Sequence, residues 1–249
     1  MHIQVISLFP KLFEVLTEEG VIARALKKDL WQLSLFNPRD FAGNPLGYVD
    51  DRPFGGGPGM VLQAEPLWLA YQAAIKKAKF VPRLLYLSPQ GSPLNEEKIQ
   101  TLAAEKELIL LCGRYEGVDE RFLQKSAAEE VSVGDFVVSG GELPAMMLID
   151  ALIRKQPGVL GDNRSASEDS FATGILDYAH YTRPAIWRGL KTPKVLLSGN
   201  HKEIALWRKR SAITRTLVRR PDLLAGQSLN QEDACLFPTT QERQAKPLK

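Results

Sequence analysis

The chain has 249 residues, 44% of them hydrophobic, and a formal net charge of +3. This length exceeds that of a typical domain and falls short of two, so we expect one domain with a smaller appendage. No run approaches the roughly 18 apolar residues of a membrane span, and no basic stretch precedes an apolar one near the N-terminus. We therefore expect a soluble, cytoplasmic protein without a membrane partner. Two distant cysteines and three scattered histidines favour neither a disulfide framework nor a protein-bound metal.

Charge is divided unevenly along the chain. Residues 181–249 contain 14 Lys and Arg against 5 Asp and Glu, a net +9, whereas residues 1–180 contain 18 against 24, a net −6. A basic C-terminal region indicates a polyanionic partner such as nucleic acid, because neutralised phosphates supply much of nucleic-acid affinity. A solvated helical face explains the same charge equally well.

The first 155 residues alternate short apolar runs with helical patterns, which predicts an α/β domain with a largely parallel sheet. We expect strands at residues 2–7, 31–36, 83–87 and 108–112. Predicted helices run from Pro10 to a stop at Gly20, from 65 to 79, from an Asn95 cap to 106, and from Pro144 onward. The last of these, PAMMLIDALIRK, has no polar face, so we expect it to be buried.

The later part of the chain has a different character. Residues 161–173 are rich in Gly, Ser, Asp and Asn and predict a flexible linker after a domain at 1–160. Residues 174–249 predict a small, basic, mostly α-helical domain. Its main helix begins with a capping box at Asn200 and Glu203 and continues through Val218.

Three glycine-bearing loops follow predicted strands or precede the apolar helix, at residues 87–93, 112–120 and 132–144. Open α/β sheets bind nucleotides at such strand ends. Neither GxGxxG nor a P-loop is present, so a ligand with an adenine and a short charged end fits better than a dinucleotide or an NTP. For each loop taken alone a tight turn is the favoured explanation, and only the three loops together shift the balance toward a ligand site. A fourth glycine cluster, at 50–60, predicts either a cover for the substrate or a disordered surface loop.

These segments resemble one known family along nearly the whole chain. DDRPFGGGPGM, LSPQGSPLN, LCGRYEGVDERF, SVGDFVVSGGELPA, ALIRKQPGVLG, EDSF, LDYAHYTRP and LLSGNHKEI are similar, in this order, to the bacterial tRNA (guanine-N1)-methyltransferase family, TrmD. The resemblance implies a SPOUT-type domain with a deep trefoil knot, and a homodimer with the active site at its interface. It also implies S-adenosylmethionine as methyl donor, magnesium as a suggested ion, and methylation of N1 of guanosine 37, next to the tRNA anticodon.

The resemblance also implies roles for individual residues. The cofactor pocket would comprise Leu87, Ser88, Pro89, Gly91, Gly113, Glu116, Gly117, Val133, Gly134, Asp135, Phe136, Val137, Val138, Gly140, Gly141, Leu143 and Pro144, with Glu116 pairing with the cofactor's amino group. Residues facing tRNA would be Asp50, Arg52, Gly55, Gly59, His180, Tyr181, Arg183, Asn200 and His201. Asp169 would be the general base and Arg154 its electrostatic partner.

The chemistry is consistent with these two catalytic roles. Methylation of guanine N1 removes a proton from a lactam, so a base must lie within hydrogen-bonding reach of N1. A cation such as Arg154 would stabilise negative charge developing on guanine O6. We expect the linker to place Asp169 only when tRNA closes the site. Alternatively, Arg154 is a favourable cation at a helix C-terminus, and Asp169 a solvated linker carboxylate.

Two other functions remain open from the sequence. A SPOUT ribose 2′-O-methyltransferase would not need a carboxylate in EDSF, and an RNA-binding protein would keep the loops without catalysis. Trp68, Trp187 and Trp207 are predicted to be packing anchors rather than base-stacking platforms. Cys112, at the end of a buried strand, is predicted to be an inert small hydrophobe.

Overall fold

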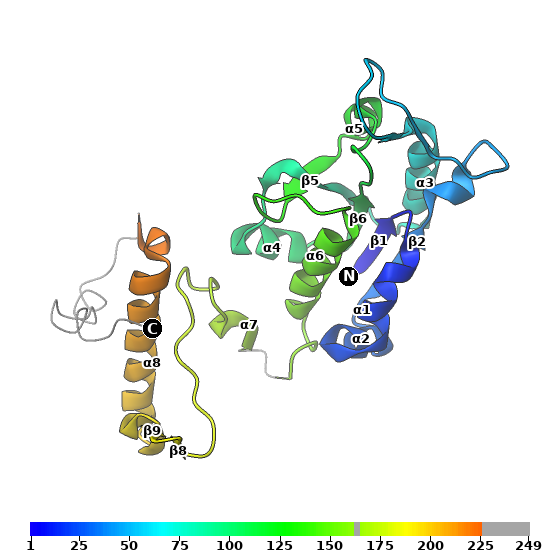
Figure 1. Cartoon of the computed structure of the whole chain (residues 1–249). Coiled ribbons are helices and arrows are strands. Elements are labelled where there is room, and N and C mark those ends of the chain that lie inside the picture. Colours follow the sequence, from blue (N-terminus) through cyan, green and yellow to red (C-terminus); the bar gives the residue numbers. More distant parts are fainter. Residues whose placement is uncertain (162–164, 226–249) are drawn as a thin grey trace. The chain divides into compact units, whose positions relative to one another are not determined.

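The computed structural model describes residues 1–161 and 165–225 (Figure 1). The chain divides into two compact units, Met1–Asn163 and Arg164–Lys249, and each has its own secondary structure. The predicted linker and the predicted basic domain therefore lie partly outside the described residues, at 162–164 and 226–249. No helix in the described ranges is both long and apolar enough to cross a membrane.

Unit 1 is built on a five-stranded parallel sheet with the strand order β2-β1-β6-β5-β7. Its strands are β1 (His2–Ile6), β2 (Gln32–Phe36), β5 (Arg83–Pro93), β6 (Glu107–Cys112) and β7 (Glu129–Ser132). All six residues of β6 are buried, as expected for a parallel sheet covered on both faces. The predicted α/β architecture and its four strands are confirmed. Strand β7 and the continuation of β5 beyond Leu87 were not predicted.

Helices cover both faces of this sheet (Figure 1). One face packs against α2 (Gly20–Lys27), α4 (Glu96–Ala103) and α6 (Glu142–Arg154), and the other against α3 (Ala64–Lys77) and α5 (Glu120–Ser126). Short helical segments also occur at η1 (Pro10–Phe13), α1 (Glu14–Glu18) and η2 (Pro38–Phe41). The predicted stop at Gly20 is displaced: α1 already ends at Glu18, and Gly20, whose φ is +83°, begins α2. Glycine adopts this left-handed conformation without strain, so the chain can turn sharply there.

Helix α6 is less buried than its composition predicts. Residues such as Ala145, Leu148 and Leu152 are fully buried against the sheet. Leu143 and Met147, however, are 56% and 57% exposed. The prediction of a wholly buried helix is therefore wrong for one stripe, because the chain supplies no described element to cover it.

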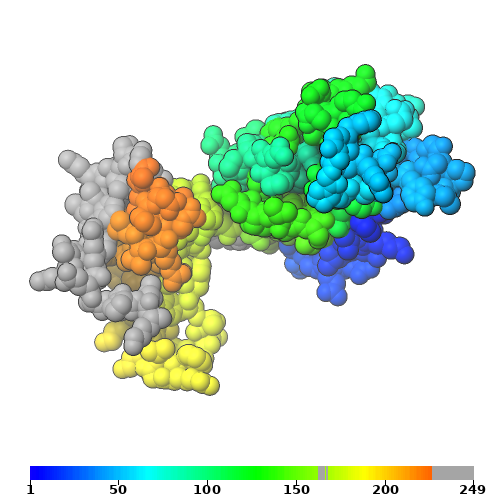
Figure 2. All heavy atoms as spheres, turned by 45° about the horizontal axis from the view of Figure 1, so that its top comes forward, coloured from blue at the N-terminus to red at the C-terminus, as the bar shows by residue number. Residues whose placement is uncertain are grey.

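The fourth glycine cluster forms the loop of a small hairpin. Strand β3 (Asp50–Asp51) pairs antiparallel with β4 (Val61–Leu62), and the residues between them are largely exposed. The light-blue segment in Figure 2 shows this loop on the surface of unit 1. Its end is ordered by the neighbouring loop: the Leu62 amide donates to the Gly117 carbonyl over 2.9 Å. The cluster is thus a surface loop anchored at both ends.

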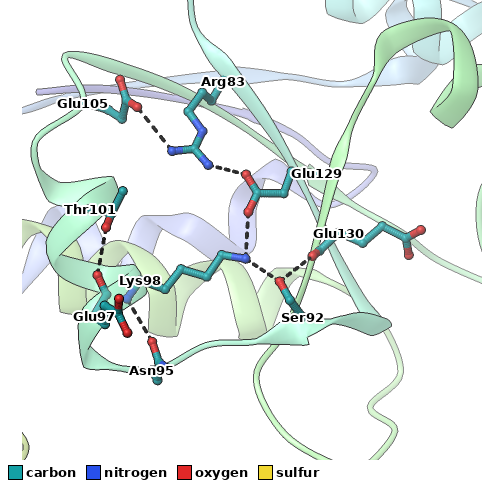
Figure 3. Close-up of polar contacts among 9 residues, drawn as sticks. All are labelled: Arg83, Ser92, Asn95, Glu97, Lys98, Thr101, Glu105, Glu129 and Glu130. Atoms are coloured by element: carbon teal, nitrogen blue, oxygen red, sulfur yellow. Dashed lines mark hydrogen bonds and ion pairs between the residues drawn. The ribbon is translucent and has the colours of Figure 1, made fainter.

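Strand β5 changes register against β7 between Leu87 and Ser92, so residues 88–91 leave the ladder. An ionic network lies beside this irregularity (Figure 3). Glu129 of β7 accepts from Arg83 of β5 and lies 2.7 Å from Lys98 Nζ of α4. Lys98 also donates to Ser92 Oγ over 2.5 Å. The network connects both parts of β5 to β7 and α4.

Unit 2 contains one long helix and several short elements. These are α7 (Ser165–Glu168), β8 (Ile186–Trp187), β9 (Leu190–Lys191), η3 (Lys194–Leu197), α8 (His201–Arg219) and η4 (Pro221–Leu224). The N-cap half of the predicted capping box of α8 is confirmed, because Asn200 Oδ1 accepts from the Glu203 amide over 3.4 Å, whereas the Asn200 amide donates to Ser198 Oγ over 3.1 Å. The hairpin formed by β8 and β9 was not predicted. Trp187 lies in it and is 58% exposed, so the packing role predicted for this tryptophan is wrong.

Candidate active site

The three predicted glycine loops meet at the carboxyl ends of β5, β6 and β7, where they surround a cavity of about 220 Å³. Because these strands are parallel neighbours, their ends lie on one edge of the sheet. The residues that line the cavity are Tyr86, Leu87, Ser88, Pro89, Gly113, Arg114, Tyr115, Glu116, Gly117, Val131, Ser132, Val133, Gly134, Phe136, Val137, Val138, Ser139, Gly140, Gly141 and Pro144.

Close packing against a neighbouring backbone or a buried side chain explains why glycines occupy two positions here. The Gly141 amide donates to the Gly113 carbonyl over 2.9 Å. A Cβ at residue 141 would lie 2.7 Å from Cys112 Cα, and one at residue 113 would lie 2.8 Å from Tyr86 Oη. The contact at residue 141 is with backbone atoms, so only glycine there lets the loop after β7 meet the end of β6, whereas a side chain at residue 113 would press on the buried Tyr86 ring.

A buried ion pair also connects these loops. Glu142, the first residue of α6, is fully buried and accepts from Arg114 Nε over 2.8 Å and from Ser7 Oγ over 2.7 Å. Arg114 also donates to the Ser139 carbonyl over 3.0 Å, and its guanidinium lies 4.5 Å from the centre of the Phe9 ring. The pair therefore connects the end of β1 with both loops.

Glu116 connects the cavity with the glycine-rich hairpin loop. Its amide donates to the Met60 carbonyl over 2.9 Å, and its carboxylate lies directly against Gly59. A side chain at residue 59 would displace this carboxylate, and the φ of +81° at Gly59 favours glycine there. The residues predicted for cofactor and for tRNA thus touch each other at this point.

Tyr86 supplies a buried hydroxyl at the cavity wall. Burial, with a smaller effect from the negative charge of Glu130, raises the pKa of Tyr86 to about 12. The phenol therefore stays protonated at neutral pH and is a hydrogen-bond donor. Burial also raises the pKa of Cys112 well above its usual value, which agrees with the predicted inert role of this thiol.

Comparison with known proteins gives the site a context. A sequence profile described as tRNA (Guanine-1)-methyltransferase TrmD matches residues 1–226. The chain belongs to the TrmD family. A protein named tRNA (guanine-N(1)-)-methyltransferase from Neisseria meningitidis serogroup C (strain 053442) is 53% identical over 244 residues, 98% of each chain. Proteins of the same name from Neisseria gonorrhoeae (strain NCCP11945) and Buchnera aphidicola subsp. Baizongia pistaciae are 54% and 48% identical over 95% and 99% of each chain. The resemblance inferred from the sequence is confirmed.

Most positions that the TrmD motifs predict for the cofactor lie around the cavity, although their binding role stays a prediction. The exceptions are Gly91, Asp135 and Leu143. Gly91 packs against the backbone of β7, where β5 resumes its pairing. Leu143 lies on the exposed stripe of α6. Six lining residues were not predicted: Tyr86, Arg114, Tyr115, Val131, Ser132 and Ser139.

The two residues predicted for catalysis belong to different units. Arg154 is the last residue of α6, half-buried at the end of unit 1. Asp169 follows α7 in unit 2, where its carbonyl accepts from the Ala172 amide over 3.2 Å. Both residues take part in interactions within the structure. Their catalytic roles stay predictions.

The predicted tRNA-facing residues form three groups. Asp50, Arg52, Gly55 and Gly59 lie in the β3–β4 hairpin and its loop. His180, Tyr181 and Arg183 are exposed and precede β8, and His180 Nε2 lies 2.7 Å from Asp177 Oδ2. Asn200 and His201 are exposed at the start of α8. Within residues 1–161 and 165–225, no group of three or more His, Cys, Asp or Glu is placed to hold a metal ion.

Proposed function

We propose that this chain transfers a methyl group from S-adenosylmethionine to N1 of guanosine 37 in tRNA, the nucleotide next to the anticodon. The observation that carries the proposal is the cavity where the three glycine loops meet, in a chain of the TrmD family. Its relatives are named for guanine-N1 methylation of tRNA. A ribose 2′-O-methyltransferase is less well supported, because no relative given above carries such a name.

The residues around the cavity suit this methyl donor. Phe136, Val137 and Val138 offer apolar surface to an adenine ring, and the glycine loops bring backbone N–H and C=O groups close to it. Glu116 offers a single carboxylate to the positive amino group. When bound, the donor supplies an electrophilic methyl group on a sulfonium. No phosphate cradle is required, in keeping with the absence of a P-loop motif.

Asp169 accepts the N1 proton in this proposal, and Arg154 stabilises the negative charge that develops on guanine O6. Binding of tRNA brings Asp169 to the nucleotide, since its segment joins the two units. The basic unit 2 attracts the tRNA backbone. Magnesium is the ion that the family resemblance suggests for this reaction.

The active form is proposed to be a homodimer with the active site at its interface. Phe9, Leu12 and Val15 are 44%, 44% and 61% exposed; Phe9 immediately precedes η1, Leu12 lies in η1 and Val15 in α1, and η1 packs against α6. Together with Leu143 and Met147 they supply apolar surface of the kind that a second copy would cover. The path of the chain from β7 across the end of β5 to Gly113 supports the trefoil knot and the SPOUT class.

The base assignment is tested by single-turnover methylation of a tRNA transcript. Asp169→Ala should slow the reaction about 100-fold or more, because general-base catalysis contributes this much. Asp169→Asn, which keeps the shape, should be equally slow. Glu168→Ala changes the adjacent exposed carboxylate and should react at the wild-type rate. Nucleoside digestion identifies the product, and a near-normal rate for Asp169→Ala would remove Asp169 from the mechanism.

A further inference from the structure

The β8–β9 hairpin is a short, tightly closed element of unit 2. Trp187 faces Leu190 and Ile186 faces Lys191 across the two strands. Arg188 and Gly189 form the turn with φ values of +50° and +82°, the backbone of a type I′ turn. The Thr192 amide closes the base of the hairpin by donating to the Ala185 carbonyl over 2.9 Å. The turn thus presents Trp187 and Arg188 side by side.

Large apolar side chains on this hairpin face solvent. Ile186, Trp187 and Leu190 are 57%, 58% and 69% exposed. Single exposed apolar residues are common, but Trp187 and Leu190 pair directly across the strands and share one face of the hairpin, which indicates a contact surface on that face. Ile186 precedes Trp187 in the strand and belongs to the opposite face. Figure 2 shows the yellow segment that contains the hairpin at the outer edge of unit 2. The Arg188 guanidinium lies 5.1 Å from the centre of the Trp187 ring.

The charge around the hairpin has one sign. Between residues 178 and 202 the chain carries Arg183, Arg188, Lys191, Lys194 and Lys202, and no Asp or Glu. Such a segment attracts a polyanion. Unpaired RNA supplies phosphates for the cations and a flat apolar base for the ring, and single-stranded RNA is recognised by aromatic and Arg side chains in this combination.

We propose that Trp187 stacks on an unpaired base of the bound tRNA while Arg188 contacts the adjoining phosphate. This proposal rests on the proposed function, since it takes tRNA as the partner. It gives unit 2 a specific contact with a nucleotide in addition to its general positive charge.

The test is the affinity of the full-length protein for a tRNA transcript, measured by filter binding. Trp187→Ala should raise the Kd roughly 5- to 150-fold, the usual effect of losing one base stack. Trp187→Phe, which keeps an aromatic ring, should recover most of the affinity. Arg188→Ala should lower the slope of log Kd against log salt by about one, whereas Trp187→Ala should leave that slope unchanged.

Ile186→Ala is the matched control, because it shortens an equally exposed apolar residue of the same hairpin and removes no ring. Its Kd for tRNA should equal that of the wild type. Binding of S-adenosylhomocysteine and the melting temperature should be the same in all variants. A Kd for Trp187→Ala within twofold of the wild type would overturn the proposal.

Two further outcomes identify which idea has failed. If Trp187→Ala keeps its tRNA affinity and changes its sedimentation, the hairpin binds protein and the proposal is wrong. If the wild type does not methylate the transcript, the proposed function itself is wrong. Normal methylation by the wild type together with unchanged binding by Trp187→Ala would reject the hairpin proposal alone.

Discussion

Glu142 lies where three parts of unit 1 meet. Its buried carboxylate accepts from Ser7 at the end of β1 and from Arg114 in the loop after β6, and Arg114 in turn donates to Ser139 in the loop after β7. A buried ion pair adds little net stability over an apolar pair, but removal of one partner leaves the other charge without compensation. The loops of the cavity therefore depend on Glu142 more than on any exposed charge.

Glu142→Ala should lower the free energy of unfolding by about 3 kcal/mol, because Arg114 and Ser7 lose a buried acceptor. Urea denaturation at pH 7 measures this loss. Glu97→Ala is the control: Glu97 is an exposed glutamate in the first turn of α4, and its removal should cost about 1 kcal/mol or less. Equal losses in the two variants would contradict the role given to the buried pair.

Sequence reasoning located the loops of this site from glycines at strand ends, and the TrmD motifs then implied roles for single residues within them. The loops around Gly113 and Gly141 were predicted correctly, because close packing at both positions excludes other residues. Arg114 and Tyr86 were missed, since a charged residue beside a glycine and an aromatic one inside a strand ordinarily indicate surface and core. The one available signal for Arg114 was Glu142, a carboxylate at the start of an apolar helix.

Among the elements, β5 is connected to β7 on both sides of its irregularity by the ionic network of Glu129, directly through Arg83 and indirectly through Lys98. Burial alone would raise the pKa of Glu129, but hydrogen bonds from Lys98 and Arg83 and their positive charges outweigh this effect and lower the pKa. A carboxyl group with a lowered folded-state pKa stabilises the protein above its unfolded-state pKa, about 4.3 for glutamate. This contribution is lost as the pH falls through the lower folded-state value.

Glu129→Gln should therefore reduce the free energy of unfolding at pH 7 by about 1 kcal/mol or less, since the side chain is about one-third exposed. The difference from the wild type should shrink as the pH falls below about 4.3. Glu130→Gln is the control, because the Glu130 carboxylate points away from Arg83 and Lys98 (Figure 3). Denaturation curves from pH 3 to 7 measure both variants, and a pH-independent difference would contradict the ion-pair origin.

The elements predicted well were those with their own periodicity or cap, such as β1, β6 and α8. Strand β7 was not predicted, because its sequence, EEVS, is short and polar at one end. The β8–β9 hairpin was not predicted, because a two-residue strand is too short to show an alternation of apolar and polar residues. Helix α6 was predicted as a helix. Hydrophobicity alone, however, does not distinguish an apolar stripe that the same chain covers from one that stays exposed in the single chain.

At the scale of the whole molecule, the exposed apolar stripe of α6 supports the proposed dimer. Met147→Arg places a charge in the apolar surface formed by α6 and η1. Desolvation of this charge on association should weaken the dimer by about 3 kcal/mol, more than 100-fold in Kd. Sedimentation at micromolar concentration should then show the monomer, and methylation should fall with dimer content if the active site lies at the interface, as proposed. Val81→Arg, at a 96% exposed position outside this surface, should leave both unchanged. A fully active monomeric Met147→Arg would mean that one chain holds a complete site, whereas an unaltered dimer would place the interface elsewhere.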